Sequence, residues 1–148
     1  MQESLTVLVI DDDTMIRKLL ESALAHKGFK VFCAASGLDG LDFAKAEDID
    51  VILLDWMMPE MDGIEVLGEL KRDCKTMHIP VFMLTSKEDT KDIDLAISKG
   101  AVDYIVKPFN TFQVPDMVQK YLEKYHHGTH THAHSQKHGF FSKLFSHR

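Results

Sequence analysis

Residues 51–59 have the sequence Val-Ile-Leu-Leu-Asp-Trp-Met-Met-Pro, in which four apolar residues run directly into the carboxylate of Asp55. A short, uninterrupted apolar run of this kind is typical of a strand that is buried on both faces of a parallel sheet. In open α/β sheets the carboxyl ends of such strands form the edge at which ligands bind. The sequence therefore predicts that Asp55 lies at a functional edge of an α/β domain.

A second apolar run also ends in acids, because residues 7–10, Val-Leu-Val-Ile, are followed by Asp11, Asp12 and Asp13. If the two strands are neighbours, these carboxylates and that of Asp55 converge on one point, where they repel one another unless a cation lies between them. Oxygen ligands suit a hard divalent cation, so we expect a Mg2+ site, in which Mn2+ would substitute. Helix capping alone accounts for Asp13, but three acids exceed what one cap requires.

Five short apolar runs alternate with segments of helical period along the chain. The predicted strands cover residues 5–10, 29–34, 51–54, 81–84 and 102–106. A segment with apolar residues at helical spacing follows each strand, and the last runs from about residue 111 to residue 125. Pro115 lies inside this last segment. Proline is tolerated only in the first turn of a helix, so the helix either begins near Val114 or is distorted at its start.

Five strand–helix repeats predict an α/β domain with a five-stranded parallel sheet and five helices on its two faces. Right-handed crossovers leave few topologies for such a sheet, among them the order 2-1-3-4-5 of flavodoxin-like folds. In that order the first and third strands are neighbours. This is the arrangement that would bring Asp11, Asp12 and Asp55 together.

Thr85 and Lys107 follow the fourth and fifth apolar runs, at the same edge of the predicted sheet. Threonine supplies a hydroxyl donor, and lysine supplies a mobile positive charge for an anion. Together with an acid cluster and a metal ion, they describe a site that handles a phosphoryl group through positioning and charge neutralisation. Asp55 lies in the middle of this set and is the natural nucleophile, which would form an aspartyl phosphate.

The bulk composition bounds the function without naming it. The chain has 148 residues, of which 45% are hydrophobic and 27% charged, which fits one soluble domain. It has no apolar stretch long enough to span a membrane and no secretory leader, and we expect a cytoplasmic protein. Cys33 and Cys74 are expected to be reduced thiols in the core, and one disulfide bridge between them is the alternative. Residues 1–125 carry 14 basic and 23 acidic side chains, which argues against direct DNA binding.

Four stretches of the chain, in this order, resemble the receiver domain of two-component response regulators, of which the stand-alone chemotaxis regulators are the simplest members. The resemblance extends over residues 5–125, so we expect a receiver domain at residues 1–125. The four stretches are residues 9–13 (Val-Ile-Asp-Asp-Asp) with Arg17, residues 54–63 (Leu-Asp-Trp-Met-Met-Pro-Glu-Met-Asp-Gly), residues 80–86 (Pro-Val-Phe-Met-Leu-Thr-Ser) and residues 100–109 (Gly-Ala-Val-Asp-Tyr-Ile-Val-Lys-Pro-Phe).

The resemblance implies that Asp55 is phosphorylated by a histidine kinase, a histidine phosphotransfer protein or a small acyl phosphate. It implies that Asp12, Asp55 and the backbone carbonyl of Met57 bind Mg2+, with Asp11 acting through water. It also implies that the domain is no enzyme beyond its own self-dephosphorylation. The phosphoprotein would bind a downstream protein through the surface of the fourth helix, fifth strand and fifth helix, which is also a surface for dimer formation.

The resemblance further implies how the switch works. Thr85 and Lys107 are expected to bind the phosphoryl group, and Tyr104 is expected to turn inward as Thr85 moves. The Lys107–Pro108 peptide bond is expected to be cis, which for an X-Pro bond costs only about 0.5–1 kcal/mol. A static, half-buried Tyr104 is the simpler alternative.

Two other functions that use similar motifs fit the sequence less well. Haloacid-dehalogenase-type phosphatases carry the pattern Asp-x-Asp-x-Thr after a strand, but Met15 stands where this pattern needs threonine. Flavodoxin-like cofactor binding would need a phosphate loop rich in Ser, Thr and Gly after the first strand, and residues 11–15 are not such a loop. Within the receiver family, a phosphoryl shuttle in a multistep relay remains an alternative to a binding switch.

Residues 126–148 form a His-rich tail that has no counterpart in the receiver family. They hold seven of the nine histidines and three basic residues without any acid. The spacing of His130, His132 and His134 suits a transition metal, and a polar tail with fortuitous metal affinity is the alternative. An apolar segment follows, which is expected to dock into a partner, touch a membrane or localise the protein. Its apolar residues are Phe140, Phe141, Leu144 and Phe145.

Overall fold

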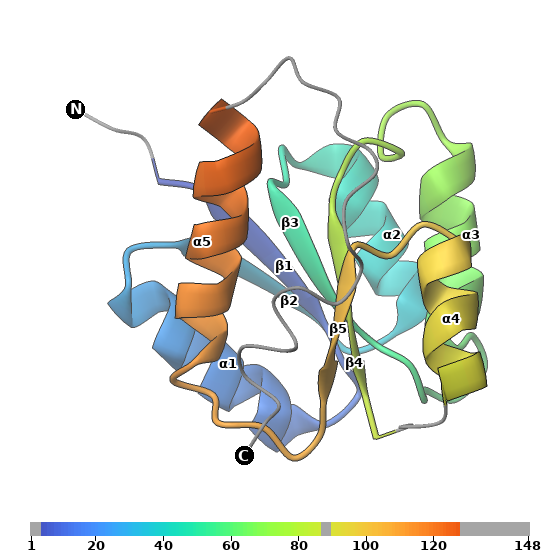
Figure 1. The fold of residues 1–148 in the computed structure, drawn as a ribbon, viewed down its shortest axis with the longest axis horizontal. Helices are drawn as coiled ribbons and strands as arrows, with labels where there is room; N and C mark the ends of the chain where they lie inside the picture. Colours follow the sequence, from blue (N-terminus) through green and yellow to red (C-terminus); the bar gives the residue numbers. More distant parts are fainter. Residues whose placement is uncertain (1–3, 87–89, 128–148) are drawn as a thin grey trace.

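The computed structural model describes residues 4–86 and 90–127, which form a parallel sheet between two layers of helices (Figure 1). The strands are β1 (Thr6–Ile10), β2 (Lys30–Ala34), β3 (Val51–Asp55), β4 (Val81–Thr85) and β5 (Asp103–Val106). The helices are α1 (Thr14–His26), α2 (Gly37–Ala46), α3 (Gly63–Arg72), α4 (Thr90–Ser98) and α5 (Val114–His127). The sheet order is β2-β1-β3-β4-β5, which confirms the predicted fold class.

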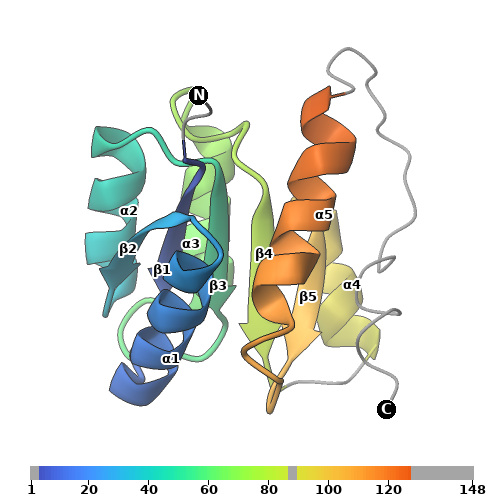
Figure 2. The ribbon, with the colours of Figure 1, turned by 90° about the vertical axis from the view of Figure 1, so that its left-hand side faces the viewer.

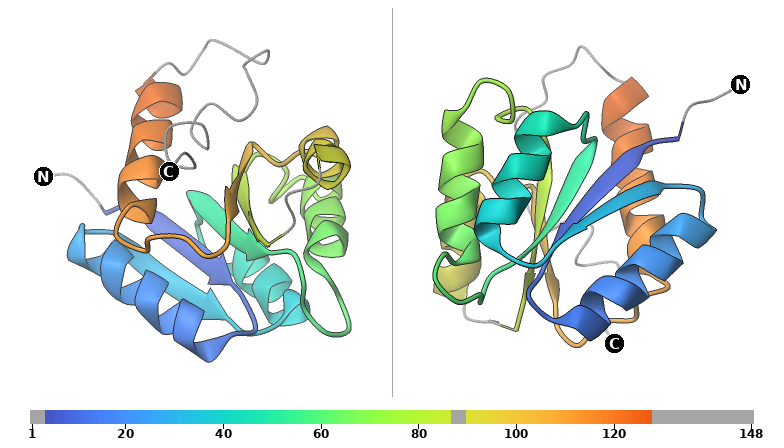
Figure 3. Two further views of the ribbon diagram at one scale, coloured as in Figure 1. Left: turned by 60° about the horizontal axis from the view of Figure 1, so that its bottom comes forward. Right: turned by 180° about the vertical axis from the view of Figure 1, so that it is seen from behind.

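The helices cover the sheet unequally, with α1 and α5 on one face and α2, α3 and α4 on the other (Figure 3). Every residue of β1, β3 and β4 is buried, because these strands have neighbours on both sides and helices on both faces. This explains why their sequences are continuous apolar runs and do not alternate. The edge strand β2 is more exposed.

Local signals in the sequence set where the helices begin. The side chain of Asp13 accepts hydrogen bonds from the backbone amides of Met15 and Ile16, so Asp13 is the N-cap of α1, as expected. Asp62 and Glu65 form a capping box at the start of α3. Helix α5 begins at Val114, which confirms the late start that Pro115 led us to expect and puts Pro115 in the first turn.

The two cysteines differ in their burial. Both cysteines are free, but only Cys33 is half-buried, whereas Cys74 is exposed, so the prediction of two core thiols is wrong for Cys74. Cys74 lies just after the end of α3, where the chain turns over the surface towards β4. None of the helices in the described ranges is long and apolar enough to cross a bilayer.

Gly63 is needed for close packing and not only for the turn that the Asp62-Gly63 pair suggests. A Cβ atom at this position would lie 2.3 Å from the backbone oxygen of Asp55 and 2.8 Å from the Cα of Trp56. Both neighbours are backbone atoms at the end of β3, so they cannot rotate away. The amide of Gly63 also donates to the carbonyl of Trp56 at 2.8 Å. The start of α3 therefore rests directly on the backbone that carries Asp55.

We expect Gly63→Ala to lower the free energy of unfolding by about 2–3 kcal/mol, because the backbone must move to admit the methyl group. Gly68→Ala in the same helix is the matched control. A Cβ at Gly68 meets only the flexible end of Arg72 at 3.6 Å. This substitution should raise the stability by about 0.5–1 kcal/mol, as alanine does in helices. Urea denaturation of both variants tests the contrast, and equal stabilities would contradict the close-packing argument.

Candidate functional site: the acidic cluster

The register of the sheet brings the predicted acidic residues to one edge. Ile10 at the end of β1 pairs with Leu54 in β3, so Asp11 and Asp55 are the next residues along two adjacent strands. Adjacent strands are about 4.8 Å apart, which is within the reach of two carboxylates. Asp11 is fixed at this place because its amide donates to the carbonyl of Ala34 at the end of β2, at 3.1 Å. Strand pairing alone thus produces the cluster.

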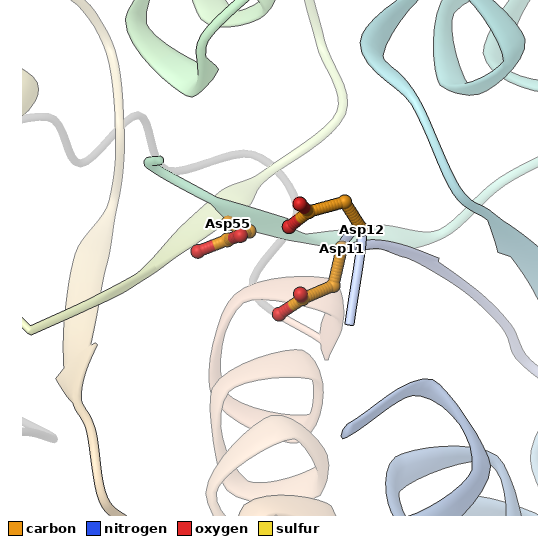
Figure 4. A group of neighbouring side chains, drawn as sticks. All are labelled: Asp11, Asp12 and Asp55. Carbon is orange, nitrogen blue, oxygen red and sulfur yellow. The ribbon is translucent and has the colours of Figure 1, made fainter. Parts of the chain in front are cut away.

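Three carboxylates converge at this edge, as Figure 4 shows for Asp11, Asp12 and Asp55. Each offers an oxygen atom that lies within 4.8 Å of the others. Asp11 and Asp55 are buried, whereas Asp12 is exposed, so the cluster opens to solvent on the side of Asp12. A donor set made only of oxygen atoms fits a hard divalent cation such as Mg2+, which keeps several waters. The residues that are present therefore fit the ion that the sequence predicted.

Lys107 is the positive charge at the centre of the site. Its Nζ lies 3.0 Å from Oδ1 of Asp55 and 3.1 Å from Oδ2 of Asp11, so it bridges β5 to both β1 and β3. The Lys107 amide donates to the carbonyl of Thr85 at 2.8 Å. The peptide bond from Lys107 to Pro108 is cis.

The charge balance of the site shifts the pKa of Asp55 strongly. Burial and the neighbouring Asp11 carboxylate raise the pKa of Asp55 from 3.8 to about 7, although the Lys107 ammonium opposes the rise. For Lys107, burial opposes the charged form, but hydrogen bonds and attraction to Asp55 and Asp11 outweigh it and raise the pKa. One ammonium is thus shared between two buried carboxylates, which leaves the site short of positive charge.

The other predicted site residues lie around this centre. Thr85 ends β4 and is fully buried, next to the strand that carries Asp55. Tyr104 is half-buried in β5 and packs against the core on the face of α2, α3 and α4. Met57 lies two residues after Asp55, with an exposed side chain. The structure thus brings the predicted metal-binding and phosphoryl-binding residues to one end of the sheet. Tyr104 lies apart from them, three residues before Lys107.

Arg17 belongs to the site only indirectly. Its Nη1 donates to the backbone carbonyl of Asp11 at 2.8 Å, and its Nη2 donates to Thr14 at 3.3 Å. The side chain therefore holds the turn between β1 and α1, which carries the acids. The Asp11 side chain also accepts from the amide of Asp13, at 2.9 Å. No role of its own was predicted for Arg17 from the sequence. Its position one turn into α1 is the signal that could have indicated this support.

The sequence matches the family model for the response regulator receiver domain over residues 7–119. The chain belongs to this family. The receiver match covers β1 to the middle of α5, and so includes every element that contributes to the acidic cluster.

Solved receivers resemble this one over nearly their whole length. The chemotaxis protein CheY4 of Vibrio cholerae is 30% identical, with a TM-score of 0.76 over 80% of this chain and 98% of that one. The receiver domain of the Francisella response regulator 1452 is 29% identical, with the same TM-score over 82% and 98%. A CheY-like receiver of Methanospirillum hungatei is 25% identical, with a TM-score of 0.76 over 82% and 96%.

Several predicted residues lie outside the described part of the receiver. They are the three histidines of the predicted metal motif and the four residues of the predicted docking segment. The roles of these seven residues remain predictions. The residues are His130, His132, His134, Phe140, Phe141, Leu144 and Phe145.

The raised pKa of Asp55 predicts a pH-dependent cost in the receiver without divalent cations. A carboxyl group whose pKa is higher in the folded state contributes stability below pH 4 that is lost as the pH rises through about 7. Asp55→Asn cannot ionise, so at pH 8 it should be more stable than the wild type by about 1–3 kcal/mol. The difference should shrink as the pH falls to 4. Urea denaturation in EDTA at a series of pH values measures it, and a constant difference would contradict the pKa argument.

Proposed function

We propose that this receiver accepts a phosphoryl group on Asp55 and that the modification switches its binding to a downstream protein. The observation that supports the proposal best is the convergence of two buried carboxylates and one shared lysine at the edge of the sheet. Family membership implies phosphoacceptor signalling. The donor is a histidine kinase or a histidine phosphotransfer protein, and small acyl phosphates would serve in vitro.

In the transfer, a carboxylate oxygen of Asp55 forms a bond to phosphorus while the P–N bond of a phosphohistidine, or the P–O bond of an acyl phosphate, breaks. The oxygen must be deprotonated, and a pKa near 7 leaves a large fraction of Asp55 ionised at neutral pH. Asp11, Asp12, Asp55 and the carbonyl of Met57 would hold Mg2+, which when bound neutralises charge on the phosphoryl oxygens. In self-dephosphorylation, the oxygen of a water molecule forms a bond to phosphorus while the bond from phosphorus to the Asp55 oxygen breaks. This step releases inorganic phosphate and regenerates the Asp55 carboxylate.

The switch follows from the charge that the phosphoryl group adds, which is about −1.5 to −2 at neutral pH. Lys107 already contacts Asp55, so in the phosphoprotein it is positioned to pair with the phosphoryl oxygens. The hydroxyl of Thr85, at the end of the adjacent strand, would move to donate to the same group. Tyr104 lies on β5, which is itself part of the surface of α4, β5 and α5, and its inward rotation would change that surface.

We expect one phosphoryl group to appear on the wild-type receiver after incubation with acetyl phosphate and Mg2+. Asp55→Asn should gain none, because it removes the nucleophile. Omission of the divalent cation should abolish the modification, and Mn2+ should restore it. Intact mass spectrometry measures each result.

Asp13→Asn is the matched control for this experiment. Its carboxylate lies beside the cluster but caps α1, and asparagine caps helices equally well, so phosphorylation should remain. Asp12→Asn, which removes a proposed ligand, should raise the Mg2+ concentration that half-maximal modification requires by about tenfold. Phosphorylation of Asp55→Asn at the wild-type level would overturn the proposal.

A phosphoryl shuttle is the second candidate, because an aspartyl phosphate that forms from a phosphohistidine also returns to one. Transfer of a labelled phosphoryl group from Asp55 to a histidine phosphotransfer protein would support the shuttle. Phosphate-dependent capture of a protein other than the kinase would support the switch. The two functions make different demands on Thr85, which only the switch uses for signalling.

We expect Thr85→Ala to accept a phosphoryl group but to lose at least tenfold of its phosphate-dependent partner capture. Ser86→Ala is the matched control, because Ser86 is the next residue and is exposed. Pull-down with each phosphorylated variant measures the captured partner, and intact mass confirms equal phosphorylation. Equal capture by Thr85→Ala and wild type would contradict the switch.

A further inference from the structure

A pocket of about 330 Å3 opens at the end of the sheet opposite to Asp55. Ile49, Pro80 and Val102 line its floor, and each lies within two residues before the start of β3, β4 or β5. A five-residue strand is about 15 Å long, so the full length of the strands separates the pocket from the proposed phosphoryl site. The proposed phosphorylation chemistry does not use it.

The walls of the pocket are largely aromatic and apolar. One wall comes from the last turns of α5, where Tyr121, Leu122 and Tyr125 face the pocket. Tyr121 is held in place by edge-to-face contact with Phe82 of β4, at 5.4 Å between ring centroids. Tyr125 stacks on Tyr121 at 4.5 Å. This wall therefore has a fixed shape and offers ring surfaces to an occupant.

The opposite wall is built around Lys71 at the end of α3. Its Nζ donates to the carbonyls of Met77 and Ile79 at 3.0 and 2.8 Å, which fixes the loop before β4. His78 lies between these two carbonyls, is exposed and forms part of the rim. The ammonium group of Lys71 thus donates to backbone carbonyls of the protein itself, which disfavours a free anion as the occupant of the pocket.

The chain itself supplies an aromatic segment beside this pocket. Helix α5 ends at His127, two residues after Tyr125 in the pocket wall, at the end of the molecule where β3 and β4 begin (Figure 2). The following 21 residues contain three of the nine phenylalanines, all within residues 140–145. Twelve residues, 128–139, connect α5 to this segment. They span at most about 40 Å and on average about 20 Å, which suffices to fold back over the pocket.

We propose that the segment 140–145 docks in this pocket of its own molecule, with Phe140 or Phe141 against the rings of Tyr121 and Tyr125. A linker of this length holds the segment at a local concentration in the millimolar range, so even a weak contact is populated. The opposite net charges of the tail and the receiver add a long-range attraction between them. Residues 126–148 carry three basic residues and no acid, whereas residues 1–125 are strongly acidic. Docking would hide an aromatic segment that otherwise contacts other proteins, and it would leave Asp55 open.

The test uses the full chain with labelled phenylalanine rings and labelled methyl groups. We expect nuclear Overhauser contacts from the rings of Phe140 or Phe141 to the methyl groups of Val102 and Leu122. His78→Trp narrows the rim and should abolish these contacts. Met77→Trp is the matched control, because Met77 is exposed beside His78 but does not line the pocket. Both variants should still be phosphorylated by acetyl phosphate. This result would show that the domain is folded and that phosphorylation does not depend on the docking.

Three results would overturn the proposal. The first is that no contact joins the phenylalanine rings to the pocket in the wild type. The second is that the rings contact only other parts of the receiver, such as the surface of α4. The third comes from mixing chains that carry different labels: contacts between chains would assign the segment to a second copy. Contacts within one chain that survive Met77→Trp and vanish in His78→Trp support docking in the same molecule.

Discussion

The repulsion between buried carboxylates at the ends of β1 and β3 is the constraint on which the rest of the receiver depends. The register of these two strands places Asp11 beside Asp55, and burial makes their charges costly. A single ammonium, from Lys107, offsets both charges. Since Lys107 belongs to β5, three strands must be aligned to bring the charges together. The start of α3, which packs on the Asp55 backbone through Gly63, then fixes the loop beside the site.

The shared lysine also connects the phosphorylation site to the surface that is proposed to signal. Lys107 follows β5 directly, and Tyr104 lies within that strand. In the unmodified protein the ammonium is divided between two carboxylates. A phosphoryl group on Asp55 would draw it, because the group carries more charge than the carboxylate that it replaces. Any adjustment at Lys107 would then act on β5, a short edge strand that has only β4 as a neighbour.

The fold and the acidic cluster were predictable because both depend on local patterns. Continuous apolar runs marked β1, β3 and β4, and the acids that follow them marked the edge where the strands end. Pairings that depend on three-dimensional contact were harder to predict. The sequence did not show that Lys107 bridges two acids, or that Gly63 touches the Asp55 backbone. Such contacts between separate elements leave no periodic pattern in the sequence. Cys74 was misplaced for the same reason, since exposure in a loop depends on the path of the chain.

The topology of the receiver also explains why the acidic cluster and the end of α5 lie at opposite ends of the strands. In a parallel α/β sheet every strand ends at one edge, and each following helix runs back to the opposite edge. Asp55 ends a strand, whereas His127 ends a helix, so any extension after α5 must start at the end of the sheet that is far from the acidic cluster (Figure 1). The pocket lies at this same end of the sheet. Side chains that precede β3, β4 and β5 line it together with side chains from the last turns of α3 and α5. A segment added after α5 can therefore contact the receiver without approaching the acidic cluster. The proposed phosphorylation and the proposed docking of the tail should for this reason be separable by mutation.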